Sequence, residues 1–404
     1  MRNFRFIGES VFRWNYASRF AVLGMLIGPP LAHAQSSAAA ASWQLKQLAY
    51  QVQEQWVQRA DPSSSSSREW EISESHIEIR SGHGLTKKKK VERGFSPQWS
   101  ASGQKMAFLG FCNGYAQCSQ LTVINADGSK RKLITQPPGE VTDFSWSPQE
   151  DKIAYVEQTL STVPRLSTSS KVFIINSDGT GGREVAKIRE SECHFTTSSA
   201  RQVTSLSVYP AWSPNGASFA FETCVEGTSA ITIADKDGNN SRVLVKGGYR
   251  GVWSTDGKRL LYLHGPTAHD ARVFICIIGL DDRAPKEIFE GDVQPLGLTW
   301  LPDGKSIAFF SMKRKTAEVF QINIDGSGLQ RIVFPRKYDF SLGSPTFSPD
   351  GTKLIVAGYR CCPNVYDSTW SDADRSAVIL LDLTSKQQRI IAKGLQPSVL
   401  WERK

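Results

Sequence analysis

The chain has 404 residues and a formal net charge of +9, with 40% hydrophobic, 10% aromatic and 22% charged residues. This composition is that of a folded globular protein and excludes a disordered or collagen-like chain. The 32 Gly and 19 Pro residues interrupt the sequence too often for long helices, so an all-α fold is disfavoured.

Residues 1–34 have the pattern of an export signal. Four arginines precede an apolar stretch at 20–31, and Ala-His-Ala at 32–34 forms a small-residue cleavage box. Cleavage near Ala34 would leave a mature chain without a transmembrane span, located in the periplasm or secreted. Retention of the segment as an uncleaved anchor is the alternative.

Residues 35–67 are predicted to form a short amphipathic helix and a linker. The apolar residues Leu45, Leu48, Val52 and Trp56 recur at spacings of three and four, which predicts a helix over 43–59. Five consecutive serines at 63–67 then form a flexible linker. The helix either packs on the main domain, predicted at 68–404, or binds a partner.

Four lysines, Lys87 to Lys90, form the densest run of positive charge. Such a run can contact phosphate or an anionic membrane, but it is more typical of a solvated edge strand. Nucleic-acid binding is therefore not predicted.

From residue 95 onward the chain repeats one pattern: an aromatic residue, Ser or Leu, a turn containing Gly or Gln-Glu, and a short apolar strand. The aromatic anchors are separated by 47, 66, 41, 47, 47 and 54 residues; they are Trp99, Trp146, Trp212, Trp253, Trp300, Phe347 and Trp401. Repeats of this length are typical of β-propeller blades.

A second tight turn recurs in the same repeats, at the Asp-Gly pairs 127/128, 178/179, 237/238 and 325/326. Glycine supplies the positive φ that short hairpin turns require. Two tight turns per repeat predict a four-stranded antiparallel meander, and the anchoring ring is expected to fill the wedge between neighbouring blades.

The number of blades depends on the role of Trp401, which has no blade after it. Short strands within residues 69–92 can complete a blade with the C-terminal strand, which predicts seven blades. Six blades, with the C-terminal strand added to an existing sheet, is the alternative.

The anchor-Ser-Pro-Asp-Gly pattern, seen at 347–351, and the Asp-Gly turn that follows it resemble the propeller repeats of the TolB family over residues 95–401. TolB is the periplasmic component of the Tol-Pal envelope system, and related repeats occur beside the catalytic domain of prolyl oligopeptidase relatives. In place of the α/β domain that precedes the TolB propeller, this sequence has the expected helix and serine linker. Binding to Tol partners is therefore not implied.

The seven cysteines fit an oxidising compartment. Cys112 and Cys118 bracket a short loop and are predicted to form a disulfide, and Cys193 with Cys224 is a second proposed pair. Cys276, in an apolar strand, is expected to be a buried free thiol, whereas the pairing of Cys361 and Cys362 stays open.

No nucleophile elbow, zinc-protease motif, Walker loop or dinucleotide fingerprint occurs, and neither a metal nor a cofactor is predicted. The loop at 361–375 carries Tyr366 and Trp370 among acidic residues, which suits contact with a partner. These features favour a non-enzymatic interaction scaffold that binds a protein partner in the cell envelope. A carbohydrate-active or lyase-type enzyme with its site in the central funnel is the alternative.

Overall fold

The computed structural model describes residues 43–60, 68–111, 119–136, 139–161, 167–189, 208–265, 273–291, 293, 297–313, 316–332, 345–359 and 376–403. The chain divides into residues 1–40 and 41–404, and all described residues belong to the second unit. Within them the structure is all-β apart from the 3₁₀ turn η1 (His83–Leu85). No helix in these ranges is long and apolar enough to span a membrane.

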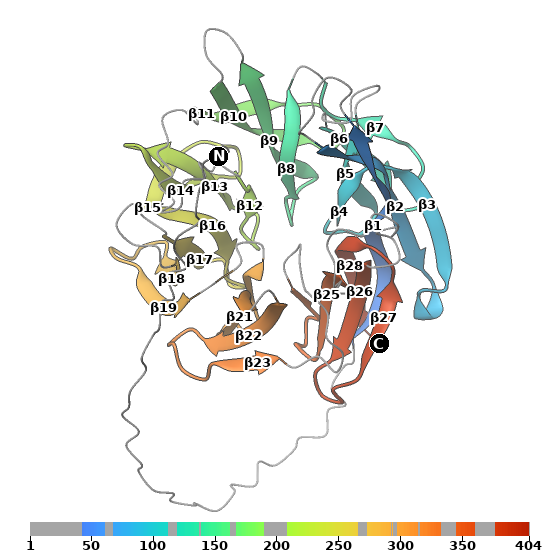
Figure 1. Ribbon diagram of the computed structural model, residues 1–404. Helices are drawn as coiled ribbons and strands as arrows, with labels where there is room; N and C mark the ends of the chain where they lie inside the picture. The colour runs from blue at the N-terminus through green and yellow to red at the C-terminus, as the bar shows by residue number, and fades with distance from the viewer. Residues whose placement is uncertain are drawn as a thin grey trace, which may run out of the picture. The chain divides into compact units, whose positions relative to one another are not determined.

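Twenty-eight strands form seven four-stranded antiparallel sheets, which are the blades of a propeller (Figure 1). Blade 1 holds β4 (Phe95–Trp99), β5 (Lys105–Phe111), β6 (Ser119–Asn125) and β7 (Lys132–Leu133); blade 2 holds β8 (Glu140–Trp146), β9 (Lys152–Ser161), β10 (Ser167–Asn176) and β11 (Arg183–Arg189); blade 3 holds β12 (Ala211–Trp212), β13 (Ser218–Val225), β14 (Thr228–Asp235) and β15 (Arg242–Lys246).

The next three blades follow in chain order. Blade 4 holds β16 (Gly248–Trp253), β17 (Arg259–His264), β18 (Val273–Gly279) and β19 (Lys286–Gly291); blade 5 holds β20 (Thr299–Trp300), β21 (Ser306–Lys313), β22 (Thr316–Asn323) and β23 (Gln330–Ile332); blade 6 holds β24 (Thr346–Phe347), β25 (Lys353–Tyr359), β26 (Ser376–Asp382) and β27 (Gln388–Ala392).

Blade 7 is built from both ends of the described chain. Its strands lie in the order β28 (Leu395–Arg403), β1 (Trp43–Ala60), β2 (Arg68–Ser81) and β3 (Lys87–Arg93). The innermost strand therefore comes from the C-terminal end and the other three from the N-terminal end. Seven blades, closed by residues from both ends, are confirmed, and the six-blade alternative is excluded.

The helix predicted over 43–59 is wrong, because these residues form strand β1 of blade 7. Leu48, Tyr50 and Val52 are buried against blade 6, whereas the neighbouring Ala49 is buried against blade 1. A strand that is covered on both faces has apolar residues at irregular spacings, which imitate a helical stripe. The propeller thus begins at Trp43, earlier than the predicted boundary at residue 68.

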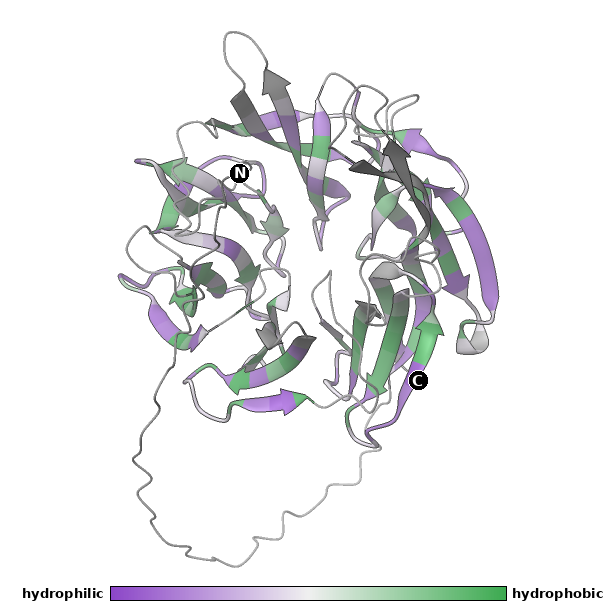
Figure 2. Ribbon diagram, in the orientation of Figure 1, coloured by the Kyte–Doolittle hydropathy of each residue, from purple (hydrophilic) through white to green (hydrophobic). Residues whose placement is uncertain are grey.

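The core is divided among seven apolar clusters, one at each interface between neighbouring blades. Blades 2 and 3, for example, enclose Val156, Ile174, Trp212, Phe219 and Phe221. Figure 2 shows the resulting alternation of apolar inner strands with more polar outer strands. Because every blade has two such interfaces, the ring is stabilised mainly by contacts between sheets.

The Ser and Asp that follow an anchor hold the turn into the second strand. The Ser254 hydroxyl donates to the Asp256 carboxylate (2.5 Å) and accepts from the backbone N–H of Arg259 (2.9 Å). Ser348 and Asp350 make the equivalent bond at 2.5 Å. The repeated Ser-x-Asp-Gly letters therefore encode one hydrogen-bonded turn, in which Gly257 takes a φ of +68°.

Five tryptophan anchors lie between blades and are 6% to 8% exposed: Trp99, Trp146, Trp212, Trp253 and Trp300. Each indole N–H donates to a backbone carbonyl of the preceding blade, at Ser398 (3.2 Å), Gln98 (3.1 Å), Ser145 (3.1 Å), Ala211 (2.8 Å) and Val252 (3.1 Å) respectively. The anchors therefore add a circle of hydrogen bonds between blades to the wedge of apolar rings.

The other two anchors lack this bond. Phe347 has no N–H in its side chain, and the indole nitrogen of Trp401 is buried without a hydrogen-bond partner among the described residues. Both rings are half-buried and pack against clusters at the two faces of blade 6. The hydrogen-bonded circle is thus interrupted on either side of blade 6.

Candidate active site at the propeller axis

The first strand of each blade lies closest to the axis, because β8, β12, β16 and β20 contact one another in succession. Three residues before the anchors of blades 2, 3 and 4 stand Asp143, Tyr209 and Arg250. All three side chains are half-buried. Asp143 and Arg250 interact electrostatically although blade 3 separates their blades, which places both toward the axis.

Arg250 is the centre of this group. Its guanidinium lies over the Tyr209 ring at 3.5 Å from the ring centroid, and its backbone N–H donates to the Glu222 carboxylate at 2.5 Å. The residue adopts a φ of +63° beside an irregularity in the pairing of β16 with β17. Such a backbone is unfavourable for a residue with a side chain, and bulges of this kind commonly re-aim side chains at functional sites.

Glu222 and Asp143 are two carboxyl groups with different pKa values. Burial raises the pKa of Glu222 to about 8, against the opposing effects of the Arg250 backbone N–H and charge, and Asp143 raises it further. Burial also raises the pKa of Asp143, to about 6, although the Arg250 charge opposes this shift. At pH 7 Asp143 is therefore mostly ionised and Glu222 mostly protonated.

Tyr249 precedes Arg250 in β16 and adds a second phenol to the region. Burial, with the nearby Glu222 charge, raises its pKa to about 12, so this phenol stays protonated and can donate a hydrogen bond. We call Asp143, Tyr209, Glu222, Tyr249 and Arg250 the axial cluster. It offers a proton acceptor, a proton donor and a fixed cation, which are the components of general acid–base chemistry on an anionic substrate.

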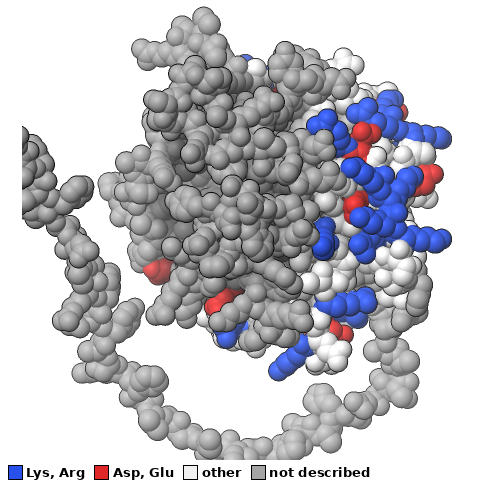
Figure 3. Space-filling view, turned by 45° about the vertical axis from the view of Figure 1, so that its right-hand side comes forward, with Lys and Arg blue, Asp and Glu red and all other residues white. Residues whose placement is uncertain are grey.

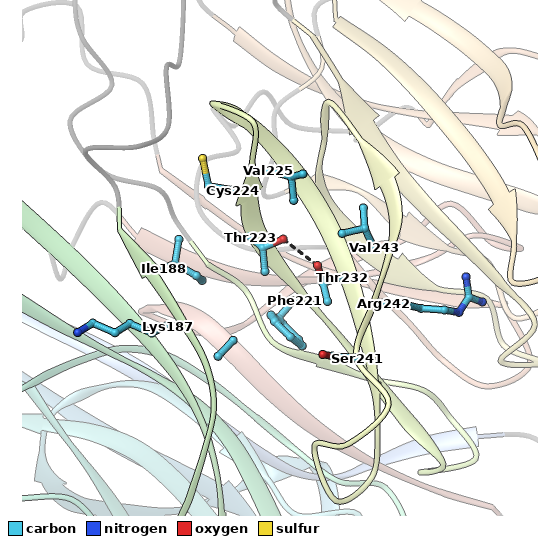
Figure 4. Close-up of a pocket in the computed structure, with 11 residues that line it drawn as sticks. Lys187, Ile188, Phe221, Thr223, Cys224, Val225, Thr232, Ser241, Arg242 and Val243 are labelled. Atoms are coloured by element: carbon cyan, nitrogen blue, oxygen red, sulfur yellow. Dashed lines mark hydrogen bonds between the residues drawn. The ribbon is translucent and has the colours of Figure 1, made fainter.

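A separate pocket of about 290 Å³ lies between β11 of blade 2 and the strands of blade 3 (Figure 4). Phe221 and Thr223 line it, and strand alternation places their side chains on the opposite face of β13 from Glu222. Lys187 and Arg242 extend away from each other at its two ends. Among the described residues no carboxyl group lines this pocket, so its described lining lacks the acid–base pair of the axial cluster.

Several residues singled out in the sequence lie outside the described ranges: Cys112, Cys118, Cys193, Tyr366 and Trp370. Cys224 is disulfide-bonded, but its partner is not among the described residues, so the pairing with Cys193 stays a prediction. Cys276 is free and buried, as expected. Within the described residues, no three His, Cys, Asp or Glu side chains are grouped as metal ligands would be.

None of the axial cluster was singled out in the sequence. The signal was present in the repeats themselves: at the third position before the anchors of blades 1 to 5 the chain carries Ser96, Asp143, Tyr209, Arg250 and Gly297. A position that is structurally equivalent in every blade but varies between charged, aromatic and small residues indicates a surface built for a ligand.

Comparison with known proteins supports the fold. The family model described as the TolB beta propeller domain matches residues 195–364. An uncharacterized protein of Agrobacterium fabrum is 26% identical over 235 residues, which covers 56% of this chain and 77% of that protein. An uncharacterized peptidase of Bacillus subtilis, YuxL, is 27% identical over 238 residues, covering 56% of this chain and 31% of the peptidase.

Two solved structures share the architecture. A puromycin-hydrolysing peptidase of Mycobacterium tuberculosis superposes with a TM-score of 0.55 and 14% identity, covering 85% of this chain and 54% of the peptidase. An oligogalacturonate lyase of Vibrio parahaemolyticus gives 0.51 and 10%, covering 70% of this chain and 80% of the lyase. The chain thus spans about a third to a half of these peptidases.

These comparisons contradict two expectations. The predicted non-enzymatic scaffold is wrong as the main interpretation, because the matched proteins that carry a functional name are peptidases and a lyase. The corresponding expectation that the chain is not an enzyme fails for the same reason. The repeated anchors and the seven four-stranded blades show that the chain is a β-propeller, and residues 195–364 of it match the TolB propeller family model.

Proposed function

We propose that this protein is a propeller enzyme of the carbohydrate-active, lyase type, with its active site in the axial cluster. The observation that carries the proposal is the convergence of Asp143, Glu222 and Arg250 from three different blades. Longer connections follow strands β9, β11, β17 and β25. Because antiparallel strands alternate in direction, these four strands end at the same face of the ring, and this is the face nearest the axial cluster. Loops at one mouth commonly supply substrate contacts.

Arg250 defines the substrate class. A guanidinium stacked on an aromatic ring keeps a fixed orientation and presents several donors to a carboxylate. We infer that it binds the carboxylate of a sugar acid in an oligosaccharide. Neutralising that carboxylate also makes the adjacent C–H bond more acidic, which favours elimination over simple hydrolysis.

The proton steps follow from the two pKa values. Ionised Asp143 takes the proton from the carbon next to the substrate carboxylate, and the electron pair forms a carbon–carbon double bond as the neighbouring glycosidic C–O bond breaks. Protonated Glu222 gives its proton to the departing oxygen. The products are an unsaturated sugar acid and a shortened oligosaccharide, and transfer of the proton from Asp143 to Glu222, directly or through solvent, restores both groups.

The similar structures support this choice of reaction. The match to the Vibrio parahaemolyticus lyase covers 80% of that protein. The matches to the two peptidases cover only about a third to a half of those proteins. Peptide hydrolysis would also require an activated nucleophile, whereas the axial cluster offers two carboxyl groups that transfer protons. The axial acid–base pair therefore favours elimination.

The test is an assay for unsaturated products from oligogalacturonate and other hexuronate oligosaccharides, followed by ultraviolet absorbance. Asp143→Asn and Glu222→Gln should each lower kcat by about 10²–10⁴-fold, because each removes a proton-transfer group. Arg250→Lys should mainly raise KM, since an ammonium cannot reproduce the stacked, flat guanidinium.

Glu140→Gln is the matched control, because Glu140 lies in the same strand as Asp143 but accepts a hydrogen bond from Ser119 (3.3 Å). It should keep the wild-type rate. Circular dichroism and urea unfolding would establish that each variant is folded. The proposal would be rejected if the folded wild-type protein released no unsaturated product from any hexuronate oligosaccharide. It would also be rejected if Asp143→Asn kept the wild-type rate.

We also propose that the protein acts in the periplasm or outside the cell. A disulfide at Cys224 supports an oxidising compartment, and the pattern of residues 1–34 supports export. Mass measurement of protein recovered from cell fractions tests this: a chain that starts at Gln35 in the envelope fraction or the medium is expected. An intact chain confined to the cytosol would contradict it.

A further inference from the structure

The outer edges of blades 7 and 1, at β3 and at the turn before β7, carry a concentration of positive charge. We define the basic rim as the exposed lysines of β3 and the two cations of the turn before β7; these are Lys87, Lys88, Lys89, Lys90, Lys130 and Arg131. Lys132 of β7 lies on the other face of blade 1, near Asp178 of blade 2. Figure 3 brings this side of the molecule forward, and Lys and Arg side chains gather on it.

The two halves of the rim belong to one surface although they come from different sheets. The Lys89 ammonium donates to the backbone carbonyl of Asp127 in the turn between β6 and β7. Arg131 Nε lies 3.3 Å from the Glu92 carboxylate at the end of β3. These contacts hold the outer edge of blade 7 against the outer edge of blade 1.

The rim has a clear excess of positive charge. Asp127 and Glu92 adjoin it, and the buried carboxylate of Glu78 holds Lys88 at 2.7 Å, so among the described residues six cations face three carboxylates. The outer strand of blade 4 differs, because β19 alternates Lys286 with Glu287 and Glu290. Protection of an exposed strand edge explains a few lysines per blade, but not this accumulation on two neighbouring blades.

An apolar side chain lies within the same surface. Leu133, the last residue of β7, is 40% exposed, and its pairing with Thr122 places it on the side of blade 1 that faces blade 7. Cations with long aliphatic stems around an exposed leucine match the interface of a lipid bilayer, where headgroup phosphates meet acyl chains. Strands at the outside of a ring face outward, so a broad surface fits them better than a polymer held in a groove.

We propose that the basic rim binds the surface of a membrane that contains anionic phospholipid. Each lysine near such a surface contributes about 1 kcal/mol, which corresponds to roughly fivefold in partitioning. Bound in this way, the propeller lies with blades 7 and 1 against the lipid and its axis along the membrane plane. The axial cluster then stays accessible from solution.

The experiment is sedimentation of the purified protein with vesicles of phosphatidylcholine, with and without phosphatidylglycerol. Wild-type protein should bind vesicles that contain phosphatidylglycerol, and added salt should weaken the binding. Lys87→Gln combined with Lys130→Gln should weaken partitioning about 25-fold. Lys88 is left unchanged, because it pairs with buried Glu78 and its loss would disturb the fold.

Lys258→Gln combined with Lys305→Gln is the control, since it removes the same charge from exposed lysines of blades 4 and 5. This variant should bind vesicles like the wild type. Equal losses in both double variants would show attraction to net charge alone and would overturn the proposal. Absence of vesicle binding, or binding of heparin or DNA without vesicle binding, would overturn it as well.

Discussion

Removing one indole N–H from the interblade circle tests whether these hydrogen bonds stabilise the ring. Trp300→Phe keeps a large apolar ring between blades 4 and 5 but deletes the bond to the Val252 carbonyl, which measures 3.1 Å. A hydrogen bond contributes about 1 kcal/mol net, and a carbonyl left buried without a partner raises the cost to about 3 kcal/mol. We therefore expect the free energy of unfolding to fall by about 1–3 kcal/mol.

Two further variants separate the hydrogen bond from the packing of the ring. Trp300→Ala removes both and should cost about 3–5 kcal/mol. Trp401→Phe removes an indole N–H that is buried without a partner among the described residues, so no bond is lost. Its effect should stay within about 1 kcal/mol, because release of an unpaired donor offsets the lost contact area.

The measurement is urea unfolding followed by tryptophan fluorescence and circular dichroism, with each variant compared with wild type. Equal losses for Trp300→Phe and Trp401→Phe would refute a stabilising role of the hydrogen bonds. A Trp300→Phe variant as stable as wild type would show that packing alone determines the contribution of this anchor.

The remaining predictions concern titration and thiols. Turnover should follow a bell-shaped pH dependence between about 6 and about 8, because Asp143 must lose its proton and Glu222 must keep one; a flat profile would contradict these roles. Cys276 should resist thiol reagents until the protein is unfolded, since it is buried and burial raises its pKa to about 11; rapid labelling of folded protein would disagree. Non-reducing peptide mapping should recover Cys224 in a disulfide, with Cys193 as the predicted partner, and a free Cys224 would exclude that bond.

The fold was largely predictable because its determinants are local and repeated. Each anchor, its Ser and its Asp-Gly turn form contacts within a few residues, as at Ser254 and Asp256, so the pattern survives in the sequence. Strand β1 was missed because its apolar spacing fits a helix, whereas in the fold it pairs with β2 and with β28, the latter more than 300 residues away. Burial between two neighbouring blades, which the local sequence does not reveal, selects the strand.

The axial cluster was harder to predict for a related reason. Glu222 and Arg250 are 28 residues apart, and each by itself is an ordinary charged residue in a strand. Their meeting with Asp143 results from the angle between successive blades. The local sequence pattern carries no information about that angle. Predicting the axial cluster would have required comparing the residues at equivalent positions of successive repeats.

The pairing of β28 with β1 has a consequence for biosynthesis. Blades 1 to 6 are translated in order, but blade 7 lacks its innermost strand until residues 395–403 have been made. Until then the edge of β1 has no partner, and the apolar residues that contact Val399 and Trp401 remain uncovered. The ring therefore cannot close on an unfinished chain, so the polypeptide stays open until its last strand has been made. A truncated product displays the unpaired strand to proteases, so closure distinguishes finished molecules from fragments.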